Sequence, residues 1–142
     1  MPTIYKFICF CLLTVCSSAQ AQLWSPASAN WIRYGDNSYG SAWHYDANYV
    51  SVQGRYRSAW HVINYSQNIS QPGYSPAYSI TGNYTINCSA MTYMVMVVKH
   101  YSSHFGRGQI TRVVKDSEPG ADNWKSVGTA QLRTFAEMIC AR

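Results

Sequence analysis

The chain has 142 residues, and its 11 Lys and Arg residues against six Asp and Glu residues give a formal net charge of +5. The basic residues are scattered singly, without a run of like charge, which favours solubility over nucleic-acid binding. The length fits one domain with a real hydrophobic core. No apolar stretch beyond the first 21 residues is long enough to cross a bilayer.

The first 21 residues have the pattern of an export signal. Lys6 precedes an apolar run over residues 7–15, which is too short for a membrane span. The segment ends in Ala19-Gln20-Ala21, an A-x-A cleavage site. We therefore expect cleavage after Ala21 and a single domain over residues 22–142, which loses one basic residue and keeps a formal charge of +4.

Lipidation is the alternative fate of the same segment. Leu13-Thr14-Val15-Cys16 resembles a degraded lipobox, in which Val15 is bulkier than the small residue normally found before the lipidated cysteine. Both interpretations predict an exported protein, in the periplasm or at the outer-membrane surface.

Alternating polar and apolar residues dominate the first half of the exported chain. Residues 41–46 and 49–53 predict short strands, with a turn at residues 46–48 between them. Residues 57–65 predict a clearer strand. Residues 66–76 contain Gln71-Pro72-Gly73 and a second proline and predict a long loop, after which residues 78–88 return to strand chemistry.

The next segment is the most apolar part of the exported chain. Residues 90–100 have no polar face before Lys99, which predicts a central strand buried on both sides. Residues 105–108 predict a glycine-marked turn or bulge, residues 109–115 a further strand, and residues 116–125 a loop. Strands joined by turns without intervening helices predict an antiparallel sheet.

One helix is predicted, at the C-terminus. Thr129 is the predicted N-cap, and one helical face is predicted by the spacing of Leu132, Phe135, Ala136, Ile139 and Cys140. Removal of the signal leaves only Cys88 and Cys140, and an exported domain almost always oxidises a single cysteine pair. We expect this disulfide to hold the helix on the sheet and to contribute about 4 kcal/mol by chain entropy.

Short motifs are spread over most of the chain after the signal. The first motifs are Trp31-Ile32, residues 43–46, Tyr49-Val50 and residues 57–60. The most specific motifs come later, at residues 84–88 (YTINC), 100–108 (HYSSHFGRG) and 135–141 (FAEMICA). In order and spacing they resemble the surface-adhesin protein E family of Gram-negative envelope proteins.

The resemblance implies an α+β fold, in which an antiparallel sheet of about six strands carries a C-terminal helix linked by a disulfide to its concave face. It also implies an envelope location. For the founding adhesin of the family, it implies binding to host extracellular-matrix or serum proteins.

Metal and catalytic patterns are weak. His100 and His104 would lie about 13 Å apart on a strand, so we read them as surface histidines and predict no metal site and no cofactor. His44 and His61 read as sheet residues beside tryptophans. The chain has no G-x-S-x-G elbow, and its cluster of Asp116, Glu118 and Asp122 lies in a predicted loop.

The aromatic residues are the best candidates for a contact surface. Five Trp and 12 Tyr residues are more than a core of this size needs, and Tyr, Trp and Arg together make good protein contacts. Cross-strand packing is the alternative role for any one of them. The positions singled out are Arg55, Tyr56, Arg57, Trp60, Tyr74, Tyr78 and Tyr84.

The sequence thus predicts a non-enzymatic envelope binding module, adhesin-like, with a protein partner. The second hypothesis is a periplasmic structural or accessory protein of an envelope complex. A third is a hydrolase with residues dispersed over several strands, which would require His, Ser and carboxylate side chains to converge in one cleft.

Overall fold

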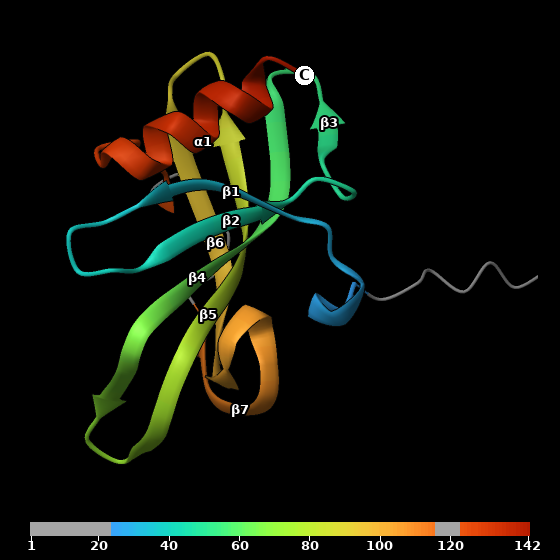
Figure 1. The fold of residues 1–142 in the computed structure, drawn as a ribbon. Helices are drawn as coiled ribbons and strands as arrows, with labels where there is room; N and C mark the ends of the chain where they lie inside the picture. Colours follow the sequence, from blue (N-terminus) through green and yellow to red (C-terminus); the bar gives the residue numbers. More distant parts are fainter. Residues whose placement is uncertain (1–23, 116–122) are drawn as a thin grey trace, which may run out of the picture.

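The protein is built from antiparallel strands and a C-terminal helix (Figure 1). The computed structural model describes residues 24–115 and 123–142, so the predicted signal, Cys16 and most of the predicted loop over residues 116–125 lie outside the described residues. The elements in chain order are η1 (Pro26–Ser28), β1 (Trp31–Asp36), β2 (Ala42–Asp46), β3 (Ser51–Gln53), β4 (Tyr56–Gln71), β5 (Tyr74–Asn87), β6 (Thr92–Ser103), η2 (His104–Gly106), β7 (Arg107–Lys115), β8 (Lys125–Ser126) and α1 (Ala130–Cys140).

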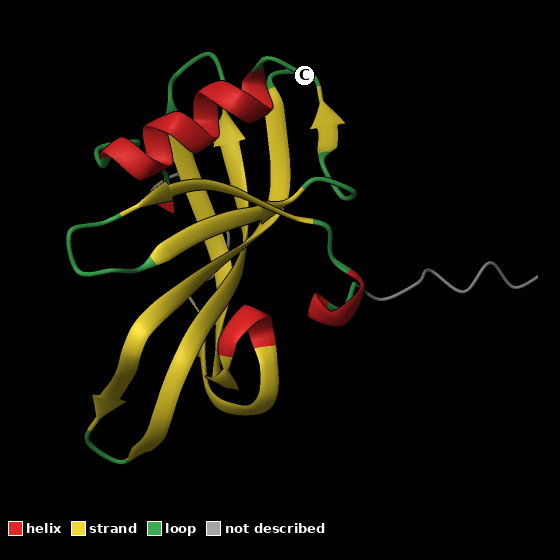
Figure 2. Cartoon of the chain, in the orientation of Figure 1, coloured by secondary structure: helices red, strands yellow, loops and turns green. Residues whose placement is uncertain are grey.

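The strands form a single antiparallel sheet in the order β1-β2-β4-β5-β6-β7. In the described residues two short strands join its margins, β3 beside the start of β4 and β8 beside the start of β6. Helix α1 lies across one face of this sheet (Figure 2). The predicted α+β fold is confirmed, and the six strands of the main path match the number expected.

The core lies between α1 and the sheet. Leu132, Phe135, Ala136 and Ile139 are all buried, and the Thr129 side chain accepts a hydrogen bond from the backbone N–H of Leu132, as an N-cap does. These side chains pack against a group from the sheet and the segment before the helix, namely Tyr45, Ala59, Ile86 and Val127. The predicted helical face and its cap are confirmed.

The predicted disulfide is present. Cys88 directly follows β5, and Cys140 is the last residue of α1. Their Cα atoms are 5.7 Å apart, and 52 residues separate them in sequence. The bond therefore fixes the C-terminal end of the helix to the end of a central strand.

The predicted loop over residues 66–76 is wrong. Strands β4 and β5 continue through it as a long hairpin, in which Ile69 pairs with Ala77 and Gln71 pairs with Tyr74. The Pro72-Gly73 pair forms only the tight turn, where Gly73 has a φ of +79°. Polar residues stay extended here because cross-strand pairing satisfies their backbone N–H and C=O groups. The turn that Pro72 and Gly73 indicate is therefore much shorter than the predicted loop.

The prediction for residues 90–100 is only partly right. Strand β6 is central, since it pairs with β5 on one side and with β7 and β8 on the other. Burial on both faces is wrong, because residues 92–95 and 97–99 are only half-buried. Helix α1 covers one face of the sheet, and no second helical layer among the described elements covers the other (Figure 1).

Candidate binding surfaces

An aromatic and basic group lies at the start of β4, formed by Arg55, which is exposed just before the strand, and by Tyr56 and Arg57, which are half-buried. The Arg55 guanidinium lies 5.2 Å from the centroid of the Tyr56 ring and donates a hydrogen bond of 3.0 Å to the Tyr56 hydroxyl. Arg57 donates to the carbonyl of Gly54 at 2.7 Å. The Tyr56 ring also stacks on Trp124, with centroids 5.7 Å apart. We call this group the β4 base.

Trp60 belongs to a different cluster, which anchors the N-terminal segment. Its ring stacks on Trp24 with centroids 3.8 Å apart, and Trp24 meets Trp31 edge-on at 6.0 Å. The Trp24 indole N–H donates to the buried Asp46 carboxylate at 2.9 Å, which also accepts from the Asn30 backbone N–H at 2.9 Å. Trp60 therefore packs within the chain, against the segment that precedes β1.

A third group lies where the β4–β5 hairpin turns and is formed by Tyr74, Tyr78 and Arg112. Tyr74 is 49% exposed, and the Arg112 guanidinium lies 4.5 Å from its ring centroid. Tyr78 meets the His104 ring edge-on at 5.4 Å. His104 is held in place because its Nε2 donates to the backbone carbonyl of Tyr65 at 2.8 Å. We call this group the hairpin tip.

The predicted contact residues do not form one continuous surface. Tyr56 pairs with Asn87 at one end of the β4–β5 ribbon, and Gln71 pairs with Tyr74 at the other. At roughly 3.3 Å per residue these ends are up to about 50 Å apart. Tyr84 is half-buried and packs against the core, stacked on His61 with centroids 4.1 Å apart, which favours a structural role.

His61 is a core residue with a structural role. It is fully enclosed by aromatic rings, and the Tyr34 hydroxyl lies 3.2 Å from its Nδ1. Burial, with a smaller contribution from His44, lowers the pKa of His61 to about 3. The ring is therefore neutral at physiological pH. Its position beside Trp43, with centroids 5.4 Å apart, agrees with the sequence prediction.

The turn between β6 and β7 is fixed by buried polar side chains. Asn64 accepts from the Phe105 backbone N–H at 2.6 Å, and Ser79 accepts from the Gly106 N–H at 3.0 Å. Ser79 also donates to the Ser103 carbonyl at 2.6 Å. Phe105 has a φ of +59°, an unusual conformation for a residue with a side chain, and these bonds hold it. Sequence patterns gave no signal of this network.

His100 and His104 do not combine as metal ligands. The predicted surface position is wrong for His100, which is buried beside Arg112 of β7. Burial, followed by the Arg112 charge, lowers the pKa of His100. His104 is exposed and already bonded to a carbonyl. Over residues 24–115 and 123–142, no three His, Cys, Asp or Glu side chains gather as a metal site requires.

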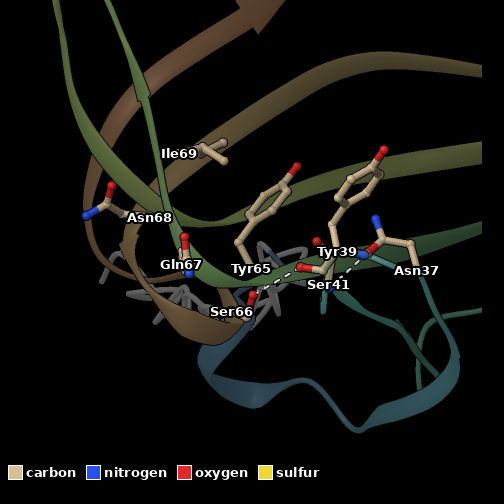
Figure 3. A pocket seen from close by; sticks show the side chains of 8 residues that line it. All are labelled: Asn37, Tyr39, Ser41, Tyr65, Ser66, Gln67, Asn68 and Ile69. Atoms are coloured by element: carbon tan, nitrogen blue, oxygen red, sulfur yellow. Dashed lines mark hydrogen bonds between the residues drawn. The ribbon is translucent and has the colours of Figure 1, made fainter.

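A polar cleft, which the sequence did not predict, lies between the β1–β2 loop and β4. Its volume is about 550 Å³ (Figure 3). The residues that line it include no charged side chain and no histidine, so the convergence required for the hydrolase hypothesis does not occur in this cleft. They are Asn37, Tyr39, Ser41, Tyr65, Ser66, Gln67, Asn68 and Ile69.

Comparison with known families shows what kind of protein this is. A family model described as surface-adhesin protein E matches residues 31–141, which is most of the chain. The chain belongs to the surface-adhesin protein E family. The resemblance inferred from the motifs is thereby confirmed. An adhesin family is not an enzyme class.

Solved structures of surface-adhesin protein E share the fold. Crystal form II of Haemophilus influenzae protein E superposes with a TM-score of 0.58 at 18% identity, covering 78% of this chain and 87% of that one. Protein E from non-typeable Haemophilus influenzae gives a TM-score of 0.57 at 17% identity, covering 83% of this chain and 82% of that one. A search of curated protein sequences gives no significant match.

In the part of the chain that the structure describes, no helix has the length and apolarity needed to cross a bilayer.

Proposed function

We propose that the protein is an exported, non-enzymatic binding module of the cell envelope that attaches to a protein partner in the manner of an adhesin. The family match over residues 31–141 carries this proposal. The partner class is a host extracellular-matrix or serum protein. Export rests on the predicted signal over residues 1–21, which leaves residues 22–142 as the mature domain.

We propose that the hairpin tip makes the principal contact. The β4–β5 hairpin extends away from the part of the sheet that α1 covers (Figure 1), so its end is accessible to a large partner. Tyr74 and Arg112 form a preassembled pair there, with the guanidinium 4.5 Å from the ring centroid. Tyr and Arg are the residues that most often dominate binding energy at protein interfaces, because they combine apolar area with directed polar groups.

The other predicted contact residues have different roles in this proposal. The β4 base offers a second aromatic and basic surface, but its Arg57 is committed to the Gly54 carbonyl and Tyr56 is covered on one side by Trp124. Trp60 is stacked on Trp24 and serves to hold the N-terminal segment. The β4 base is therefore the secondary contact surface.

The purified domain over residues 22–142 tests this proposal. Its affinity for a panel of extracellular-matrix and serum proteins should fall at least tenfold in a Tyr74→Ala/Arg112→Ala variant, the loss expected when a contact of more than about 1.4 kcal/mol is removed. A Tyr49→Ala variant is the matched control, since Tyr49 is a tyrosine exposed to a similar extent (41%) outside the tip. Equal binding by the tip variant and the wild type would reject the assignment of the tip.

Protease treatment of intact cells tests the location. Surface display predicts that the protein is released or cleaved, whereas a periplasmic protein stays protected. Protection, together with binding to a purified envelope component and to none of the host proteins, would support the alternative role as an accessory protein of an envelope complex.

A further inference from the structure

The polar cleft is formed by a break in strand pairing. Strand β2 pairs with β4 only as far as Asn64, and the β4–β5 register shifts between Asn64 and Ile69. The intervening β4 residues leave the regular ladder, which bends the strand as a bulge does. The β1–β2 loop, residues 37–41, lies against this bend and forms the opposite wall of the cleft.

The walls of the cleft are held by bonds that do not use its binding groups. Asn37 Oδ1 accepts from the backbone N–H groups of Tyr39 and Ser41, each at 3.0 Å. Ser66 donates to the Tyr39 carbonyl at 3.1 Å and so ties the loop to β4. Gly40 allows this close approach, because its φ is +76° and an added Cβ would lie 2.9 Å from Ser66 Oγ. The cleft is therefore largely preformed, as small-molecule sites usually are.

The groups that face the cleft are free to bind a ligand. Four polar groups form no hydrogen bond with the described remainder of the chain. They are the hydroxyls of Tyr39 and Tyr65, the Asn37 amide N–H₂ and the Gln67 amide. Figure 3 shows the two tyrosine rings pointing in the same direction above the loop and the strand. The site thus offers aromatic faces beside groups that both donate and accept hydrogen bonds.

The chemistry of this lining selects a class of ligand. An anionic ligand would lose its hydration without a cationic partner in the lining, so carboxylates, sulfates and phosphates are disfavoured. A wholly apolar ligand would leave the amides and hydroxyls unpaired. A neutral sugar matches both features, since its hydroxyls pair with amides and its C–H face packs on aromatic rings.

We propose that this cleft binds an uncharged oligosaccharide, with Tyr39 and Tyr65 packing against sugar rings and Asn37 and Gln67 bonding its hydroxyls. The volume of about 550 Å³ lies within the usual range for ligand sites and suits a di- or trisaccharide. The cleft shares no lining residue with the hairpin tip, so the two proposals can be tested with different variants.

The test is an array of neutral di- and trisaccharides printed beside their sialylated and sulfated counterparts, probed with the purified domain over residues 22–142. The proposal predicts retention on neutral glycans and a loss of at least tenfold in Tyr39→Ala and Gln67→Ala variants. Tyr39 is 85% exposed and Gln67 is also exposed, so neither change disturbs the fold. Tyr49→Ala is the matched control and should bind like the wild type.

Three outcomes would overturn the proposal. They are no retention on any neutral glycan, a preference for the charged glycans, and neutral-glycan binding that the cleft variants leave intact. The result is independent of the protein-binding proposal, because the Tyr74→Ala/Arg112→Ala variant should keep its glycan binding while losing its protein partner.

Discussion

Removal of the disulfide should destabilise the protein by a predictable amount. A Cys88→Ser/Cys140→Ser variant opens a loop whose ends are 52 residues apart in sequence. In the chain-entropy treatment, the loss of a loop of this size costs about 4 kcal/mol at 25 °C. For a domain of this length that corresponds to a fall in Tm of roughly 10–20 °C. The helix alone is too short to be stable in water, so its contacts with the sheet depend strongly on this bond.

Calorimetry and urea denaturation of the oxidised wild type, the reduced wild type and the double variant would measure this effect. The reduced wild type should melt like the variant, and reductant should not change the variant. Hydrogen exchange should be faster in α1 than in β4 and β5 of the variant, because the bond anchors the C-terminal end of the helix. A variant that melts within about 3 °C of the oxidised wild type would refute the reasoning.

Three further predictions concern the core and the β6–β7 turn. The contribution of His61 to the free energy of unfolding should fall by about 1.4 kcal/mol for each unit that the pH drops from about 6.5 toward 3, because the unfolded chain binds a proton that the buried His61 ring does not. Urea denaturation at pH 7.5 and 4.5 should show a smaller difference in a His61→Phe variant than in the wild type, and equal differences would contradict this account. Phe135→Ala should lower the free energy of unfolding by about 3–5 kcal/mol in urea denaturation, since the ring is fully buried. A loss no larger than that of Thr134→Ala, at an exposed position, would place the core elsewhere. Gly106→Ala should lower the free energy of unfolding by at least about 1 kcal/mol more than Gly73→Ala in the same assay. Both glycines have positive φ, but of the two only Gly106 would place the added Cβ 2.8 Å from Pro26 and Thr81. Equal losses of stability would show that this contact relaxes freely.

The helix and its disulfide could be predicted because their signals are local or compositional. Thr129 caps the helix through its own side chain, and the buried face repeats within eleven residues of α1. The pairing of Cys88 with Cys140 follows from the prediction that removal of the signal leaves only these two cysteines. Strand positions such as β2 followed from alternation, which is also a short-range pattern.

The cleft and the turn network could not be predicted because both depend on long-range register. Asn64 reads as an ordinary strand residue, yet it bonds the backbone of Phe105, 41 positions away. The cleft exists because β2 stops pairing with β4 at that same Asn64, and a sequence pattern does not encode where pairing stops. The extension of β4 and β5 was missed for a related reason, since pairing stabilised polar residues that look like a loop.

The central claim is tested most directly by the adhesion of cells that express this protein to surfaces coated with extracellular-matrix proteins. Cells with the wild-type protein and with Tyr49→Ala should attach equally, and cells with Tyr74→Ala/Arg112→Ala should attach like cells that lack the protein. Attachment by the tip variant at the wild-type level, or attachment that does not depend on the protein at all, would contradict the account.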